Sequence, residues 1–323
     1  SPRPAHSHGE GFSSSRRGLP AAARKAWSAP VMVVRLEGGA DMADDPPLLH
    51  SGWGSGLVVS LDEAGGRRPD RTAVIATTSH VVRCREFPCR YAVGFTEPKG
   101  SEARYWTTRA SLEESSPGID LAFLTVELPP PVSPSAPTLA DPACHGDDLA
   151  PTLTVGWPNL TLRTGWSVPP PSNPDLLLKR FSTGTRVQYI SAYPLRTADP
   201  QRRERVPIIL HNADLLPGSS GGPLLDEDGH VVGINSRILV PGDRPEKFNY
   251  CAVEADRHSP GEDCINMAIS SRAIAEAFGE LFGAHLPLQE CNGIESDPPL
   301  QMAEADRENA DSSSELLTES AEK

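Results

Sequence analysis

Apolar and β-branched residues occur in short runs, which polar, turn-rich stretches separate. Runs of this length are typical of strands, and the Asp228-Gly229 pair between two of them is a strong hairpin signal. Pro207 lies inside one run, so that strand is expected to be an edge strand or to begin after the proline. Many short strands with few helices predict an all-β barrel or sandwich. The predicted strands cover residues 31–36, 56–61, 72–75, 122–126, 153–155, 206–210 and 230–234.

The remaining segments differ from this pattern. Apolar residues recur at helical spacing over residues 270–282, with Ser270 or Ser271 as the N-cap, and predict a helix at the end of the domain. Residues 167–174 hold four prolines and are expected to form a surface loop. Residues 1–28, rich in Ser, Arg, Pro and Ala, predict a flexible arm, and the acidic residues 288–323 predict a disordered tail. The folded domain is therefore expected to span residues 29–287.

The charge of the 323-residue chain argues against some partners. The formal net charge is −13, and residues 294–323 alone hold nine acidic and two basic residues. A nucleic-acid groove needs clustered Lys and Arg, so the acidic balance argues against such a partner. No run approaches the roughly 18 apolar residues of a membrane span, so no membrane span is expected.

The six cysteines permit three disulfides. Cys84 and Cys89 are close enough to staple a small loop, and Cys251 and Cys264 bracket a polar stretch; Cys144 and Cys291 remain as a possible third pair. Free thiols are an alternative. A zinc site fits less well, because no second close pair completes a four-ligand set. Disulfides persist in oxidising compartments, so an extracytoplasmic location, secreted or periplasmic, is expected.

The segment Gly218-Ser-Ser220-Gly-Gly-Pro-Leu224 is the sharpest motif in the chain. A serine hydroxyl is a poor nucleophile until a base takes its proton, and its chemistry needs N–H donors aimed at the developing oxyanion. Flanking glycines allow a tight turn that brings the N–H groups of Gly218 and Ser220 to one side of the hydroxyl. The alternative is an ordinary Ser/Gly turn. A following hairpin favours the first interpretation.

The general base is expected among nine histidines. His80 ends an apolar stretch, where a rigid strand entering a turn would hold its ring, whereas the other histidines lie in polar segments or pack in place. Asp120 opens a mostly apolar run and is the candidate carboxylate that orients the imidazole, although an Asp there could simply cap a turn. The order His80, Asp120, Ser220 matches one of the convergent orders of a catalytic triad.

Seven short blocks stand in order along the chain: Gly54-Ser-Gly56, Thr78-Ser-His80-Val-Val82, Ile119-Asp120-Leu-Ala122, Ser182-Thr-Gly184, the Ser220 motif, Gly233-Ile-Asn235 and Met267-Ala-Ile-Ser270. Together they resemble the trypsin-like peptidases of the HtrA/Deg type over roughly residues 30–286. The resemblance implies two six-stranded antiparallel β-barrels of the chymotrypsin fold, about residues 29–140 and 141–287, with the active site between them. It also implies hydrolysis of protein or peptide substrates without a cofactor or metal. No PDZ-like module is expected in the acidic residues 288–323.

Substrate preference stays open. Asp214 lies six residues before Ser220, and in trypsin-like enzymes with basic specificity an aspartate at that offset lies at the base of the primary pocket. HtrA-type enzymes instead accept small aliphatic residues, and Asp214 could also cap a turn. Asn235, Ser236 and Arg237 are expected to form a wall of the substrate site, where Arg237 could neutralise Asp214. The rival function is a catalytically silent barrel that serves as a protein-binding module.

Overall fold

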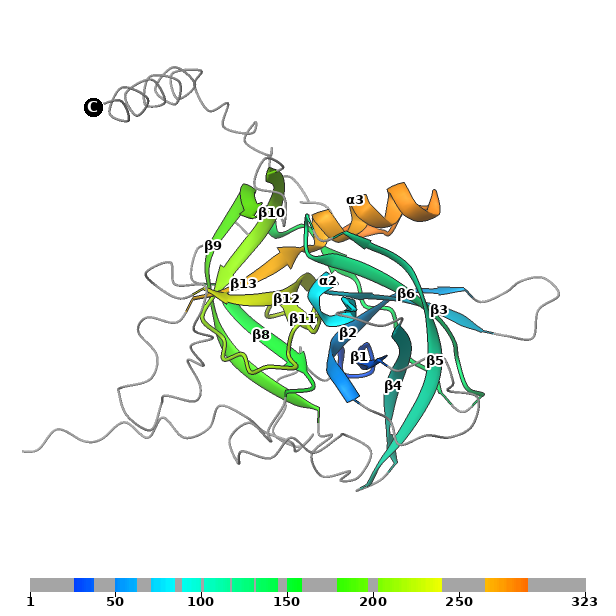
Figure 1. Ribbon diagram of the computed structural model, residues 1–323. Coiled ribbons are helices and arrows are strands. Elements are labelled where there is room, and N and C mark those ends of the chain that lie inside the picture. Colours follow the sequence, from blue (N-terminus) through cyan, green and yellow to red (C-terminus); the bar gives the residue numbers. More distant parts are fainter. Residues whose placement is uncertain are drawn as a thin grey trace, which may run out of the picture. The chain divides into compact units, whose positions relative to one another are not determined.

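The computed structural model of the chain forms two β-barrels with a helix at the end of the second (Figure 1). The structure describes residues 26–37, 50–62, 71–84, 89–99, 102–116, 118–130, 132–144, 150–158, 179–196, 203–239 and 265–289. The expected arm up to residue 25, the proline-rich loop and the acidic tail beyond residue 289 lie outside these ranges.

Six antiparallel strands close the first barrel in the order β1-β2-β3-β6-β5-β4. Side chains from all six strands meet inside it, and most are aliphatic because successive strand residues point alternately inward and outward. Ile75 and Leu124 are fully buried there. The strands are β1 (Pro30–Glu37), β2 (His50–Asp62), β3 (Thr72–Thr77), β4 (Cys89–Lys99), β5 (Glu102–Ser116) and β6 (Leu121–Glu127).

The second barrel is also closed by six strands, in the order β11-β8-β9-β10-β13-β12, and the β11–β12 pairing joins its ends. The predicted all-β fold of two six-stranded barrels is confirmed. Two short strands, β7 (Leu139–Ala140) and β14 (Leu288–Gln289), extend the sheet in parallel beside β12. The barrel strands are β8 (Pro151–Gly156), β9 (Arg180–Arg196), β10 (Arg203–His211), β11 (Pro223–Leu225), β12 (Val231–Leu239) and β13 (Ile265–Ser270).

Two local predictions for this barrel can be compared with the structure. The Asp228-Gly229 hairpin is confirmed, because β11 and β12 pair antiparallel and Gly229 has a φ of 82°. Pro207 lies inside β10, at a shift of register against β9, and the pairing with β13 begins only at Ile208. A proline cannot donate to a ladder, so it falls where no ladder bond is needed.

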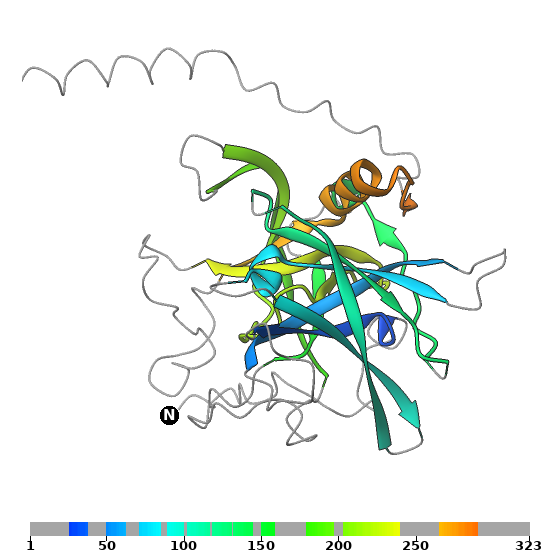
Figure 2. The same cartoon turned by 45° about the vertical axis from the view of Figure 1, so that its right-hand side comes forward.

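The helix α3 (Ser271–Phe282) follows β13, as its periodicity predicts. The Ser270 side chain accepts a hydrogen bond from the Ala273 N–H, and Gly283 ends the helix with a φ of 63°. Phe278 and Phe282 pack edge-on against Phe123 of β6, so the helix covers the first barrel as well as the second (Figure 2).

The segment before β1 also contacts the second barrel. Ala26 is buried, and Trp27 packs against the large core cluster that contains residues of both barrels, so packed structure begins slightly before the expected boundary at residue 29. Lys179 Nζ donates to the Trp27 carbonyl at 2.6 Å and lies over the rings of Trp27 and Trp157. At the far end, Gln289 still pairs with Ala140, two residues beyond the expected limit of 287.

The predicted Cys84–Cys89 disulfide is present. Cys144 also takes part in a disulfide, and its partner lies outside the described residues. The Asp141 N–H donates to the Gln289 carbonyl at 3.1 Å, so the end of the described chain packs near Cys144. Cys251, Cys264 and Cys291 lie outside the described residues. No helix in the described part of the chain is long and apolar enough to span a membrane.

Candidate active site

His80 lies in α2 (Ser79–Val82), a single helical turn that follows β3 in the first barrel. Arg35 of β1 is buried beneath this turn, and its Nη1 donates to the carbonyls of Arg83 at 2.6 Å and Val81 at 3.3 Å. A cation suits the unpaired carbonyls at the end of a helical turn. The backbone of His80 is thereby fixed, while 47% of its side chain remains exposed.

Asp120 directly precedes β6 and is buried. Its φ of 55° lies in the left-handed region, which Asp tolerates better than most side chains. This backbone turns its carboxylate toward His80. One carboxylate oxygen accepts the His80 N–H at 3.1 Å, and the Nδ1 atom lies 3.0 and 3.1 Å from the two oxygens. The imidazole is therefore held with Nδ1 toward the carboxylate and Nε2 facing away.

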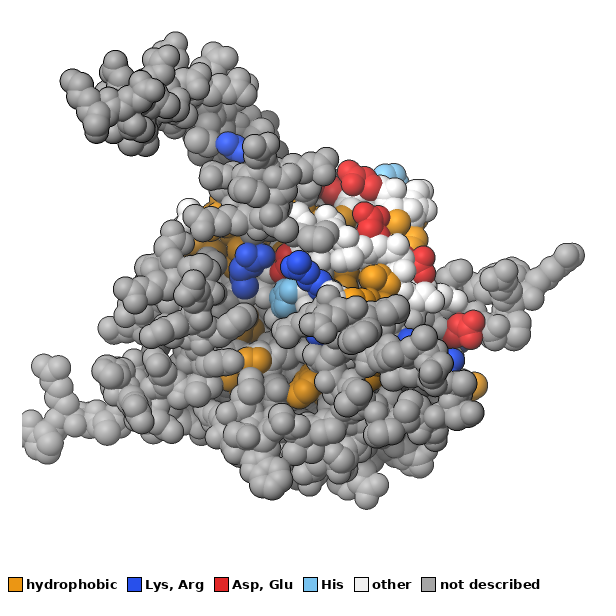
Figure 3. Space-filling model, in the orientation of Figure 1, with side chains coloured by type: hydrophobic (Ala, Val, Ile, Leu, Met, Phe, Trp, Pro, Cys, Tyr) orange, Lys and Arg blue, Asp and Glu red, His pale blue; other side chains and the backbone are white. Residues whose placement is uncertain are grey.

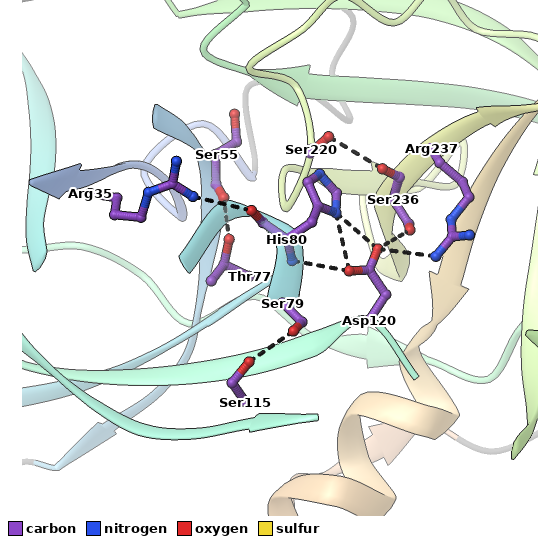
Figure 4. A network of polar contacts seen from close by, with 10 residues as sticks. All are labelled: Arg35, Ser55, Thr77, Ser79, His80, Ser115, Asp120, Ser220, Ser236 and Arg237. Atoms are coloured by element: carbon purple, nitrogen blue, oxygen red, sulfur yellow. Dashed lines mark hydrogen bonds and ion pairs between the residues drawn. The ribbon is translucent and has the colours of Figure 1, made fainter. Parts of the chain in front are cut away.

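The second barrel supplies two further contacts to Asp120. The Ser236 hydroxyl donates to its carboxylate at 2.5 Å, and the Arg237 guanidinium lies 3.8 Å away (Figure 4). Burial alone would raise the pKa of Asp120, but His80, the Ser236 hydroxyl and Arg237 outweigh it and hold the pKa below its usual value. The carboxylate therefore stays charged at neutral pH.

Glycines shape the loop that carries Ser220. Gly218 and Gly221 have φ values of 92° and 84°, a region that side chains disfavour. A Cβ on Gly221 would lie 2.0 Å from the Ser55 carbonyl, and one on Gly222 would lie 2.4 Å from the Val155 carbonyl. The loop can pack this closely only because both residues lack a side chain.

Two N–H groups of this loop are candidates for binding an oxyanion. Within the described ranges, neither the Gly218 nor the Ser220 N–H donates a hydrogen bond to another group, which suits them to bind an oxyanion. The Ser220 hydroxyl itself donates to the Ser236 carbonyl at 3.2 Å rather than to His80. Ser236 therefore joins the candidate nucleophile to Asp120, using its carbonyl for one and its hydroxyl for the other (Figure 4).

The structure separates the four residues expected at the substrate site. Asn235 is fully buried, and its side-chain amide donates to the Gly222 carbonyl at 2.9 Å, so it supports the loop and cannot contact a substrate. The expectation for Asn235 is corrected accordingly. Ser236 and Arg237 contact Asp120, as described above. Asp214 is exposed, and its N–H donates to the Ser182 hydroxyl at 2.8 Å, so its backbone is anchored while its side chain reaches the surface.

The face that carries α2 is open to solvent. Figure 3 shows a histidine side chain beside basic side chains where α2 lies in Figure 1. The exposed fractions of the His80 and Arg237 side chains, 47% and 42%, agree with this view. A cavity of about 460 Å³ lies elsewhere, between α3 and strands β5, β6 and β10. Its walls include Ile119 and Leu121 but not Asp120, so it is separate from the candidate site.

Two barrels that meet at this constellation define the chymotrypsin-like fold. Residues 54–234 match the family of the trypsin-like peptidase domain. This match covers more than half of the chain, and the chain belongs to that family. No curated protein sequence matches the chain.

Solved structures of proteases are among those similar to the chain. A variant of the HtrA-type protease AlgW with a tripeptide has 20% identity and a TM-score of 0.50 over 81% of this chain and 63% of that one, and this likeness concerns the fold. The active form of the Rv3671c protease from M. tuberculosis has 19% identity and a TM-score of 0.49, over 83% and 87% of the two chains. Deg5 has 15% identity and a TM-score of 0.49, over 83% and 94%. The chain thus spans less than two thirds of the AlgW chain.

Three supporting residues were not identified from the sequence in these roles. Ser236 holds Asp120, Arg35 holds the turn of His80, and Ser55 contacts the loop of Ser220. Ser55 lies in the Gly54-Ser-Gly56 block, so a sequence signal existed for its importance but not for its contacts. Arg35 lies inside an apolar run, and a single buried cation needs hydrogen-bond partners. This position could therefore have indicated that Arg35 holds nearby backbone carbonyls.

Proposed function

We propose that this chain is a serine endopeptidase that hydrolyses protein or peptide substrates through an acyl-enzyme. Ser220 attacks the scissile carbonyl while His80 accepts its proton at Nε2. Asp120 keeps the proton of the imidazole on Nδ1 and stabilises the imidazolium that forms. The N–H groups of Gly218 and Ser220 bind the oxyanion. His80 then protonates the leaving amine, and water attacks the acyl-enzyme with His80 again as base.

One observation carries this proposal. A continuous hydrogen-bonded network joins Ser220, Ser236, Asp120 and His80 across the two barrels. A structural serine would not need a neighbouring imidazole oriented by a buried carboxylate. Within the described part of the chain, the Nε2 atom of His80 has no partner, so it is available to accept a proton. Catalysis requires the Ser220 side chain to rotate from the Ser236 carbonyl toward Nε2, because apo sites often hold such bonds loosely.

The same serine contact favours a second candidate. With its hydroxyl on the Ser236 carbonyl, Ser220 is not activated by His80, as expected for a catalytically silent barrel that binds proteins. The two functions make opposite predictions for covalent labelling. A fluorophosphonate bonds covalently to an activated serine and leaves an unactivated one unmodified.

Labelling with a fluorophosphonate probe, followed by mapping of the adduct, tests the proposal. We expect the wild-type chain to be labelled at Ser220 and to hydrolyse an unfolded protein substrate. Ser220→Ala should lose both properties while keeping its circular dichroism spectrum. A folded wild-type chain that takes no label, under conditions that label trypsin, would favour the binding module.

We also propose an extracytoplasmic location for the chain. The Cys84–Cys89 disulfide supports it, because such bonds persist in oxidising compartments. Non-reducing peptide mapping of the native protein from its source should recover this bond together with Cys144–Cys291 and Cys251–Cys264. Six alkylatable thiols would reverse the assignment.

A further inference from the structure

Ser55 lies in β2 of the first barrel, fully buried against the loop that carries Ser220. Its N–H donates to the Ser220 carbonyl at 2.7 Å, and its hydroxyl donates to the Gly218 carbonyl at 2.7 Å. The same hydroxyl accepts the Trp157 N–H at 2.8 Å, and its carbonyl accepts the Thr77 hydroxyl at 2.7 Å. Ser55 thus contacts the second barrel at three points.

The contacts of Ser55 fix the peptide planes on both sides of the Ser220 N–H. The Gly218 carbonyl shares its plane with the Ser219 N–H, which donates to Leu216, and the Ser220 carbonyl shares its plane with the Gly221 N–H, which donates to Asn235. Each plane is therefore held at both ends, because Ser55 binds the two carbonyls. A peptide plane fixed in this way cannot rotate without breaking a buried hydrogen bond.

The packing around Ser55 restricts which side chain can do this. A Cβ on Gly156 would lie 2.8 Å from the Ser55 hydroxyl, and one on Gly222 would lie 3.2 Å from the Ser55 Cβ. The side chain must be small, and it must donate to one backbone group while accepting from another. Serine meets both conditions, whereas alanine would remove the donor to the Gly218 carbonyl and the acceptor for the Trp157 N–H.

We propose that Ser55 is a positioning residue, which holds the Gly218 and Ser220 N–H groups in the orientation that binds an oxyanion. The first barrel would then supply His80 and Asp120 and also set the geometry of the oxyanion site in the second barrel. This inference rests on the proposed function, since an oxyanion forms only if Ser220 attacks a carbonyl. A purely structural hydroxyl would stabilise the fold, and its removal from a protein that still folds would not lower kcat selectively over KM.

The test compares Ser55→Ala with Ser271→Ala in the full chain. Ser271 is a matched control, because it is also fully buried and its hydroxyl donates to a backbone carbonyl, that of Ala140, at 2.5 Å. We expect Ser55→Ala to lower kcat by about 10- to 100-fold with KM within about twofold, since losing one oxyanion donor outright costs about 10²- to 10³-fold. Ser271→Ala should keep the wild-type kcat.

A second readout does not depend on activity. Hydrogen exchange of the peptide covering residues 212–222 should be about fivefold faster in Ser55→Ala than in Ser271→Ala, because one lost hydrogen bond is worth about 1 kcal/mol. If Ser55→Ala does not fold, Ser55→Gly takes its place. Glycine leaves room for a water molecule between the Gly218 carbonyl and the Trp157 N–H. The expected loss of kcat is therefore smaller than for Ser55→Ala.

The outcomes separate the two proposals. A wild-type chain that neither hydrolyses protein nor takes the fluorophosphonate would overturn the proposed function, while hydrogen exchange would still show whether Ser55 fixes the loop. Equal kcat and equal exchange in folded Ser55 and Ser271 variants, with an active wild type, would overturn the role of Ser55 alone. An equal fall in kcat in both variants would show a general effect of stability and would overturn it too.

Discussion

Two buried ionisable groups of the first barrel, Arg35 and Asp120, contrast with two of the second barrel, His211 and Lys179. In the first barrel, Arg35 is surrounded by backbone carbonyls and Asp120 by donors, and the pKa of Asp120 is lowered, so both groups are buried in charged form. In the second barrel, burial lowers the pKa of His211 to about 3, partly opposed by Asn235, and Lys179 has a pKa of about 7. Arg35 and Asp120 keep their charges because each is paired, as Asp141 of the second barrel also is by Arg272, whereas burial favours the uncharged forms of His211 and Lys179.

This difference has a consequence for pH. A paired charge stabilises the native state as long as it stays ionised. Asp120 therefore adds to the free energy of unfolding above the ordinary aspartate pKa of 3.8, and this contribution is lost as the pH falls through the lower pKa of the folded state. His211 and Lys179 behave differently, because the unfolded chain binds their protons more strongly than the folded chain. His211 should therefore make the free energy of unfolding rise between about pH 3 and 6.5, and Lys179 should make it rise between about pH 7 and 10.5.

The largest expected effect tests whether the barrels form one catalytic unit. His80→Ala in the first barrel and Ser220→Ala in the second should each lower kcat by about 10⁴- to 10⁶-fold. The double variant should be no slower than either single variant, because either substitution alone already removes the activated nucleophile. Initial rates on an unfolded protein substrate measure this. Additive losses would mean that the two residues act independently.

Leu124→Ala tests the aliphatic interior of the first barrel. Leu124 is fully buried, and its truncation should lower the free energy of unfolding by about 2 to 5 kcal/mol. The loss should be the same at about pH 5 and pH 8, because the substitution touches no titrating group. Denaturant unfolding at the two pH values provides the measurement. A loss that changes by more than about 1 kcal/mol would break the comparison.

His211→Gln tests the acid side of the second barrel. His211 is fully buried with a pKa of about 3, against an ordinary histidine value of 6.5, so the unfolded chain binds the extra proton between these values. Wild-type stability should fall by about 2 to 3 kcal/mol from pH 7 to pH 4.5 on this account. In His211→Gln that part of the fall should vanish. His230→Gln, at a histidine that contacts Asp226, serves as the control and should retain it.

Lys179→Met tests the alkaline side and has the smallest expected effect. The folded pKa of Lys179 is about 7 and the ordinary lysine value is 10.5, so stability should rise by about 1 to 2 kcal/mol from pH 7 to pH 8.5. Methionine has a side chain of similar length but does not titrate, so the rise should be lost. Urea titrations at both pH values suffice. His211→Gln should keep the full rise, and its loss there would contradict the assignment to Lys179.

The strands with mainly apolar residues were predictable, and the polar ones were not. Residues 72–75 and 122–126 form adjacent strands β3 and β6, whose side chains are mostly buried, so their apolar character is continuous. The long strands β5 and β9 were missed because Ser, Thr, Arg and Glu interrupt their pattern. One face of these strands is exposed, and their pairing depends on partners far away in the sequence.

The candidate site divides in a similar way. His80, Asp120 and Ser220 were identified because each stands in a short block with its own local signal, and the structure brings them to one place. Ser55 and Gly218 are 163 positions apart, so no local pattern reports their hydrogen bond. The αL backbone of Asp120 was equally hidden, since it depends on the surrounding fold.

The segment before the first barrel packs on the second barrel, and the helix after the second barrel packs on the first. This arrangement determines how the two barrels unfold. Trp27, which precedes the first barrel, contacts Lys179 of the second through its ring and its carbonyl. The helix α3, which follows the second barrel, packs on Phe123 of the first. Neither barrel can swing away on a single hinge, because each is held by a segment that belongs to the other half of the chain. If one barrel unfolds, the segment that packs on it from the other half of the chain becomes exposed. The two barrels should therefore unfold in one cooperative transition rather than two.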